Sequence, residues 1–335
     1  MKNTFFEKLK KQLPVPKMIR FDHAGIDIGI DHIRHINFQS KNGKLLVDRY
    51  GTETLTESVD KKNPLSDNAE VITVLKKIQK EFRYKYVEVS LPEELAYIYT
   101  QEVDGGDVPM IKGQIEFKIE ENVPLKADEA IFDYVEVLSL KSGRKLVSVS
   151  VVAKKVIEDY IDAFQKANMK VVSFLIQNQA LSKSLIQKND PHAYCIVAIE
   201  KKYIVVSIVS SGIVLYTSTI TKKLFDDNLN LERTEILEEA IKDVYRIIVF
   251  WLSYIENNES YGLEKIKSII VSSTHSNIIE SEFINMMINK LALQIDKPNV
   301  WTNAFDLDEQ IPPINKIDSY QYATAIGLAL PRLIK

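Results

Sequence analysis

The chain has 335 residues, 45% of them hydrophobic and 27% charged, a composition typical of a folded soluble protein with two domains or one bilobed unit. The formal net charge of −3 gives no reason to expect a nucleic-acid surface, and a single cysteine excludes an intramolecular disulfide. No apolar run is long enough to span a bilayer and no signal peptide opens the chain, so we expect a cytoplasmic protein.

The first residues, MKNTFFEKLKKQL, have an amphipathic helical pattern that ends at Pro14. Phe5, Phe6, Leu9 and Leu13 share one face of this helix, and lysines make the remainder basic. The pattern is typical of a helix that binds an anionic membrane surface or a partner groove. A helix that docks on its own domain, or frays in solvent, explains it equally well, so both interpretations stay open.

Residues 24–50 predict three strands separated by tight turns, the second turn at Lys41-Asn42-Gly43. The same pattern returns at residues 194–220, where Ser210-Ser211-Gly212 supplies the second turn. An acid-rich helical segment follows each copy. Two copies of one unit indicate a duplicated α/β architecture with a cleft between the halves.

The other apolar patterns predict helices and strands in alternation. In chain order they are a helix at 68–82, a strand at 86–91, a helix at 110–121, a hairpin of 130–140 and 145–152, a helix at 153–168, a strand at 169–174, and helices at 177–187 and 234–257. A strand at 266–271, a helix at 277–291, a short strand at 300–301 and a helix at 320–330 complete the chain.

The order helix, hairpin, helix predicts a compact α+β subdomain inserted into the first half. The predicted division of the chain is an amphipathic N-terminal segment at 1–20, a first lobe at 21–90 and 168–189, the inserted subdomain at 91–167, and a second lobe at 190–335 whose small subdomain covers about 222–264.

Four segments carry a resemblance to a known family. They are GIDIG at Gly25–Gly29, EFKIEENVPLKADEAIFDYVEV at Glu116–Val137, AKKVIEDYIDAFQKANMKVVSFLIQNQAL at Ala153–Leu181 and YATAIGLAL at Tyr322–Leu330. With these segments the chain resembles the PilM family, the actin-like proteins of type IV pilus assembly, which are related to the cell-division protein FtsA. The likeness extends over nearly the whole chain from about Phe21. The second and third segments are more specific than GIDIG, which sugar kinases, chaperones and actins share.

The resemblance implies a bilobed actin-like α/β fold, built from duplicated ribonuclease-H-like units, with the α+β subdomain inserted. It implies a cleft for ATP and magnesium, and a partner in the cytoplasmic tail of a membrane-anchored pilus protein, PilN, which would place the chain at the inner membrane. The inserted subdomain of PilM-like proteins helps to form the groove for that tail. Phe117, Ile131, Phe132 and Tyr134 are the candidate residues that line it here.

The first phosphate loop of the implied nucleotide site retains only part of the family's sequence pattern. Asp27 is suited to orient a magnesium-bound water, and Gly29 allows close approach of the backbone. Ile30 and Asp31 stand where the family has small hydroxyl residues. The carboxylate of Asp31 would repel a neighbouring polyphosphate by about 1–4 kcal/mol per charge.

The other two nucleotide loops depart further from the family. Ala198 and Glu200 replace the aspartate and the glycine of its second loop. Ser272, Ser273 and Thr274 replace a Gly-Gly turn, although their hydroxyl groups can still bond to a nucleotide in an altered pose. We therefore expect a degenerate site with weak or no binding of ATP and magnesium and no meaningful hydrolysis.

The sequence thus predicts a cytoplasmic scaffold of pilus assembly that binds a PilN-like tail. The main alternative is an ATP-binding actin-like switch or ATPase of the pilus, type II secretion or cell-division machinery. A sugar-kinase-like enzyme is disfavoured because no catalytic base stands out, and no metal-ligand or nucleophile constellation is found in the sequence. No sequence feature decides whether the chain forms a homo-oligomer.

Overall fold

The computed structural model describes residues 22–331, apart from gaps at 42, 57–58, 60–64, 223, 225–233, 276–277, 279–280 and 292. Phe5, Phe6, Leu9 and Leu13 lie outside the described residues, so the amphipathic N-terminal helix stays a prediction.

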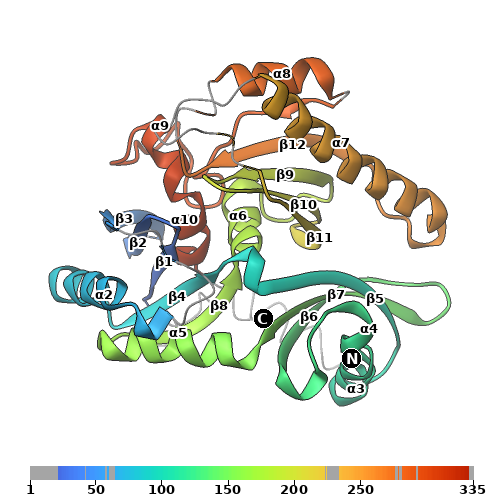
Figure 1. Ribbon diagram of the computed structural model, residues 1–335, viewed down its shortest axis with the longest axis horizontal. Helices are drawn as coiled ribbons and strands as arrows, with labels where there is room; N and C mark the ends of the chain where they lie inside the picture. Colours follow the sequence, from blue (N-terminus) through green and yellow to red (C-terminus); the bar gives the residue numbers. More distant parts are fainter. Residues whose placement is uncertain are drawn as a thin grey trace.

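The first half of the chain forms a five-stranded sheet in the order β3-β2-β1-β4-β8 (Figure 1). Its strands are β1 (Ala24–Ile28), β2 (His32–Lys41), β3 (Lys44–Thr54), β4 (Tyr86–Leu91) and β8 (Lys170–Ile176). The first three strands are antiparallel neighbours, whereas β4 and β8 run parallel to β1. All of β1 is buried, as expected for a central strand that is covered on both faces.

The second half repeats this topology in a sheet of the order β11-β10-β9-β12-β13. Its strands are β9 (Ala193–Ile199), β10 (Ile204–Ser210), β11 (Ile213–Ile220), β12 (Ile266–Ser273) and β13 (Ile295–Asp296). As in the first sheet, the first strand is central, two antiparallel strands extend one side, and two parallel strands extend the other. The duplication predicted from the strand patterns is therefore confirmed.

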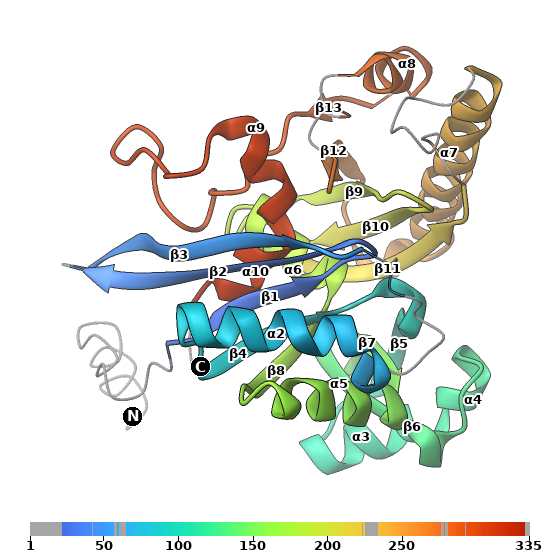
Figure 2. The same cartoon turned by 60° about the vertical axis from the view of Figure 1, so that its left-hand side comes forward.

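Helices cover the sheets and fill the space between them. The longer ones are α2 (Ala69–Phe82), α5 (Lys154–Lys166), α6 (Gln177–Leu185), α7 (Thr234–Asn257) and α8 (Glu282–Lys290). The shorter ones are α9 (Lys316–Ser319), α10 (Ala323–Ala329), η2 (Leu65–Asp67), η3 (Glu93–Leu95), η5 (Glu259–Tyr261) and η7 (Tyr320–Tyr322). Helices α2 and α5 lie side by side on the first half, and α7 covers the second sheet (Figures 1 and 2). None of the described helices combines the length and apolarity needed to cross a membrane.

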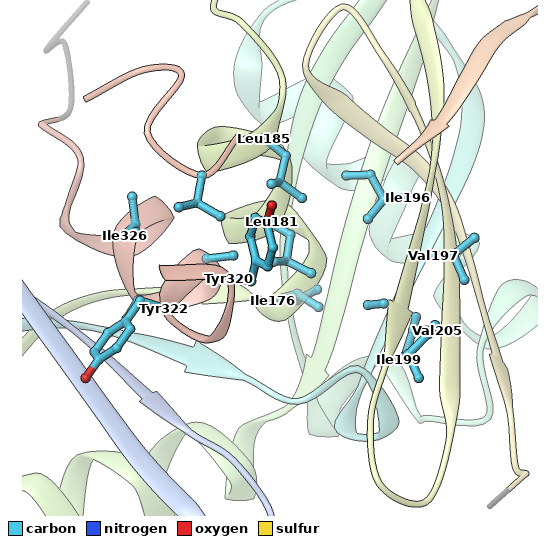
Figure 3. Close-up of a cluster of buried hydrophobic side chains, with 14 of the residues drawn as sticks. Ile176, Leu181, Leu185, Ile196, Val197, Ile199, Val205, Tyr320, Tyr322 and Ile326 are labelled. Atoms are coloured by element: carbon cyan, nitrogen blue, oxygen red, sulfur yellow. The ribbon is translucent and has the colours of Figure 1, made fainter. Parts of the chain in front are cut away.

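Helices α6 and α10 lie between the two sheets and join the halves into one core (Figure 3). Leu181 and Leu185 of α6 lie between Ile196 of β9 and Ile326 of α10 (Figure 3). The backbones approach closely at Gly327, where an added Cβ would lie 1.8 Å from the carbonyl oxygen of Ala180. A Cβ added to Gly25 of β1 would lie 2.2 Å from the carbonyl oxygen of Ala325. Both close approaches require glycine.

A smaller three-stranded antiparallel sheet, in the order β5-β7-β6, stands between β4 and β8 in the chain. Its elements are β5 (Ala96–Asp104), α3 (Val108–Phe117), α4 (Ile119–Asn122), η4 (Ala127–Glu129), β6 (Ala130–Ser139) and β7 (Arg144–Ala153). The helices α3 and α4 bury Ile111, Ile115 and Ile119 against one face of this sheet. The predicted hairpin is confirmed, and the helix predicted at 110–121 is two helices that break at Lys118.

Strand β5 corrects the sequence analysis, which expected no strand in the inserted subdomain before the hairpin. Its sequence AYIYTQEVD contains aromatic and β-branched residues that favour strands, and all nine residues pair with β7. Helix α5, assigned from sequence to the inserted subdomain, contacts α2, η2 and β8 of the first half as well as β7. The boundary at residue 167 remains a prediction.

One further prediction is wrong in the second half, and one is confirmed over the part that the structure describes. The strand predicted at 300–301 is a turn, and the last parallel strand is β13 instead. The apolar character of Val300 and Trp301 reflects burial in a turn rather than a strand, and the ring of Trp301 stacks on that of Phe305 with 5.2 Å between centroids. The helix predicted from residue 277 is described only from Glu282, where α8 begins.

One buried histidine makes the stability of the first half depend on pH. His35 of β2 is fully buried, with its ring centroid 4.4 Å from that of Phe82 and its Nδ1 3.1 Å from the hydroxyl oxygen of Tyr84. Burial lowers the pKa of His35 from 6.5 to about 4. As the pH falls below 6.5, the imidazole of His35 binds a proton in the unfolded chain, whereas in the folded protein it stays neutral until about pH 4.

We therefore expect acidification to weaken the fold through this residue. Between about pH 7 and about pH 4.5 the free energy of unfolding should fall by about 2 kcal/mol more in the wild type than in a His35→Phe variant. Urea denaturation at both pH values measures this difference. Equal pH dependence of the free energy of unfolding in the two proteins would contradict the lowered pKa of His35.

Candidate functional site

The cleft between the two halves brings together the three loops that correspond to the nucleotide loops of the family. Asp27 and Gly29 lie at the end of β1, Glu200 and Tyr203 in the β9–β10 turn, and Thr274 after β12. These side chains enclose a hollow of about 10 Å³, which is room for roughly one water molecule. The three loops therefore meet, but they leave no open chamber between them.

Glu200 occupies the centre of this meeting point. Its side chain is only 7% exposed. The carboxylate accepts hydrogen bonds from Nε2 of Gln177 at 3.0 Å and from Oγ1 of Thr274 at 2.7 Å. Sequence reasoning identified the departure at Glu200 but missed Gln177, the first residue of α6, because nothing local signals a contact across the cleft.

The two aspartates of the first loop lie in different surroundings. Asp27 is buried and accepts a hydrogen bond from Oγ of Ser90 at 2.6 Å. Asp31 stands at the cleft mouth, where it is hydrogen-bonded to His32 and lies 3.6 Å from Nζ of Lys201. The hydrogen bond from His32, aided by the nearby positive charges, lowers the pKa of Asp31 to about 2. Asp31 is therefore ionised at neutral pH.

The hydroxyl groups predicted as substitutes for a Gly-Gly turn already bond within the protein. Oγ of Ser273 donates to the carbonyl oxygen of Ile199 at 2.9 Å, and Thr274 donates to Glu200. Ser272 and Ser273 are buried in β12, and neither lines the hollow. Ala198 is buried in β9 opposite Val205 and contributes no polar group.

As the halves lie in this structure, the residues present do not fit ATP with magnesium. The hollow has the size of a water molecule, and the phenol ring of Tyr203 forms part of its wall. The side-chain oxygens of Glu200 accept hydrogen bonds and the carboxylate of Asp31 adds negative charge, at a place where a polyphosphate needs donors. No step of nucleotide chemistry follows from this arrangement.

A larger groove of about 480 Å³ lies where the inserted subdomain meets both halves. Its walls are the strands β6 and β7, the strand β8 with the start of α6, and the β10–β11 turn. Ile131 and Val135 of β6, Phe174 of β8, and Ile213 and Val214 of the second half make it mainly apolar. A volume of this size is typical of a binding site.

Two sheet edges border this groove. Strand β8 ends the first sheet and β6 ends the small sheet, so each has one side without a neighbouring strand among the described residues. An edge strand presents backbone N–H and C=O groups that pair readily with another extended chain.

Three of the four predicted partner-binding residues lie at this groove, and one does not. Ile131, Phe132 and Tyr134 line it. Along β6, Ile131 and Val135 are 42% and 50% exposed, whereas Phe132 and Tyr134 pack against the core of the inserted subdomain. Phe117 is 81% exposed on α3 and lines a separate hollow with Met110 and Arg144.

The second-half wall of the groove was missed by sequence reasoning. Ile213 and Val214 follow the turn Ser210-Ser211-Gly212, whose sequence predicts a reversal of the chain but not what the turn touches. The contacts are polar as well as apolar: Oγ of Ser182 in α6 lies 3.4 Å from the carbonyl oxygen of Gly212. Nε2 of Gln179 donates to Oγ of Ser150 in β7 at 2.8 Å.

Comparison with known proteins identifies relatives of this chain. The family described as "Type IV pilus assembly protein PilM" matches residues 25–223. Among solved structures, the "PilM-PilN type IV pilus biogenesis complex" matches with a TM-score of 0.70 and 14% identity, covering 93% of this chain and 98% of that one. That likeness spans both halves and, with the two sheets of the same topology, confirms the expected bilobed α/β fold of PilM proteins.

Other solved structures match less closely. The ethanolamine utilization protein EutJ from Carboxydothermus hydrogenoformans has a TM-score of 0.49 and 12% identity, covering 95% of this chain and 90% of that one. The cytoplasmic domain of EpsL, an inner membrane component of the type II secretion system of Vibrio cholerae, has a TM-score of 0.43 and 11% identity, covering 60% and 71%. No curated protein matches the sequence.

Proposed function

This chain belongs to the PilM family of type IV pilus assembly proteins, and from that membership we propose that it is a scaffold that binds the cytoplasmic tail of a PilN-like membrane protein. The observation that carries the proposal is the apolar groove beside β6, which has room for several side chains and two open strand edges. A solved relative is a complex of PilM with PilN.

The groove suits an extended peptide. A tail that lies along β6 or β8 would pair its backbone with an open strand edge, and alternate side chains would turn toward the apolar floor. Ile131 and Val135 are exposed at the groove and offer that floor without disturbing the core of the inserted subdomain. A scaffold held by such a tail would stand on the cytoplasmic side of the inner membrane.

The direct test is titration of the full chain into a fluorescently labelled synthetic peptide of the cytoplasmic tail of the PilN-like protein from the same organism. We expect saturable binding by fluorescence anisotropy, and no binding of a peptide with the same composition in scrambled order. Equal binding of both peptides would count against a specific groove.

We further propose that ATP is not a working ligand of this scaffold. The support is the water-sized hollow and the carboxylates of Glu200 and Asp31 in the cleft. Calorimetric titration with ATP and magnesium should give no heat of binding at millimolar ATP, and the melting temperature should not change. A dissociation constant in the low micromolar range would restore the alternative of an ATP-binding actin-like switch.

A further inference from the structure

Three contacts cross the cleft. Each joins a residue of the first half or of α6 to one of the two second-half loops that correspond to nucleotide-binding loops in the family. Nε2 of Gln177 donates to Glu200 at 3.0 Å. Nζ of Lys201 lies 3.6 Å from the carboxylate of Asp31. A terminal guanidinium nitrogen of Arg34 in β2 lies 3.4 Å from the carbonyl oxygen of Thr274. The loops that would otherwise surround a ligand are therefore linked to each other.

We propose that these contacts form an intramolecular latch that holds the two halves closed without a bound nucleotide. In the latch, the carboxylate of Glu200 takes the role of the anion around which the loops gather. This inference concerns the conformation of the protein and is independent of the groove beside β6.

Burial distinguishes two of the three latch contacts from ordinary surface contacts, whereas Lys201 and Asp31 are 28% and 27% exposed. Glu200 and Arg34 are 7% and 2% exposed. Hydrogen bonds to a buried charge are stronger than neutral ones, and removal of one partner leaves the other charge poorly solvated. Arg34 is also fixed from the other side, because it donates to Oε1 of Gln321 at 3.1 Å. Opening the cleft would expose these groups and break their bonds at once.

The position of Gln177 adds stiffness to the latch. It is the first residue of α6, the helix whose other side packs against α10 in the shared core. The next residue, Asn178, donates a hydrogen bond to Oγ of Ser207 in β10. Two successive residues at the start of α6 therefore reach the second sheet, so the latch acts on a rigid element rather than on a loop alone.

The test measures the distance between the halves. Spin labels at Lys76→Cys in α2 and Asn289→Cys in α8 place one probe on each half at exposed positions. The native Cys195 is fully buried, so it should not take a label. For the otherwise unchanged protein we expect one narrow distance distribution that is the same with and without millimolar ATP and magnesium.

A latch variant carries Glu200→Ala and Lys201→Ala in addition to the labelled cysteines. We expect a second, shifted population, with the ratio of open to closed molecules raised by about tenfold or more, because hydrogen bonds to charged groups are lost. The matched control, Glu264→Ala with Lys265→Ala, removes the same charges at exposed positions just before β12, at the opposite end of that strand from Thr274, and should leave the distribution narrow.

A charge exchange covers the case in which the latch variant does not fold. Lys201→Asp alone should broaden the distribution, and Asp31→Lys combined with Lys201→Asp should narrow it again. The proposal is overturned if the Glu200→Ala/Lys201→Ala and Lys201→Asp variants keep the narrow distance distribution, or if adding Asp31→Lys to Lys201→Asp fails to narrow it. It is also overturned if the wild type closes only when ATP is added.

Discussion

Replacing Gly327 by alanine is expected to lower the free energy of unfolding by at least about 3 kcal/mol, and to leave little folded protein at 37 °C. The new methyl group would lie 1.8 Å from the carbonyl oxygen of Ala180, and that oxygen belongs to the backbone of α6 and cannot rotate away. Helices α6 and α10 would have to separate, and this would disturb the core that joins both sheets. Thermal and urea denaturation followed by circular dichroism measure the change.

Gly113 provides the matched control for this substitution. It lies at an exposed position in α3, and a Cβ added to it meets no atom within 4 Å. Gly113→Ala should therefore raise the stability by about 0.5–1 kcal/mol, because alanine favours the helix. Similar melting curves for Gly327→Ala and the wild type would show that α6 and α10 can move apart at little cost. The close packing of Gly327 on Ala180 would then contribute little to stability.

A charged pair of substitutions in the groove is expected to abolish most of the tail binding. Ile131→Glu with Val135→Glu places two carboxylates on its apolar floor, at positions 42% and 50% exposed. Removing such apolar anchors and burying charge under the peptide should raise the dissociation constant at least about 100-fold. Because both side chains are already half exposed, the melting temperature should change little.

Phe117→Glu is the control for the groove. Phe117 is 81% exposed and lies on α3, away from the groove, so its replacement should leave the affinity for the tail peptide unchanged. Anisotropy titrations of the wild type, the groove variant and Phe117→Glu with the same labelled peptide show whether the tail binds the groove beside β6 or the hollow beside α3. If Phe117→Glu weakens binding while the groove variant binds normally, the tail uses the hollow beside α3 instead.

Much of the fold could be predicted because its signals are local. The hairpin of β2 and β3 turns at Gly43, whose φ of +80° suits glycine, and the triplet of β9, β10 and β11 turns at Gly212 in the same way. Strand β5 was missed because the glycines and proline that follow it drew attention to a break, while its pairing with β7 depends on residues far along the chain.

The candidate sites could be predicted only in part, because each is assembled from distant segments. Ala198 and Glu200 are visible as departures from a family pattern, but a sequence does not reveal that Glu200 turns inward to meet Gln177. The resemblance of the inserted subdomain to PilM-like proteins pointed to Ile131, which lines the groove, whereas Ile213 reaches the same groove from the other half and was missed. Phe117 was chosen by the same apolar criterion, but it lies on α3 and lines a different hollow, because a sequence does not show which side of the subdomain a residue occupies.

The packing of α10 against β1 has a consequence for biosynthesis. The contact between Gly25 and Ala325 joins residues 300 positions apart, so the face of β1 that α10 covers stays open until α10 has left the ribosome. At translation rates of roughly 5–20 residues per second, this interval lasts about 15–60 s. Throughout that time, β1 exposes apolar surface that is fully buried in the folded protein, which makes the nascent chain a natural client for chaperones.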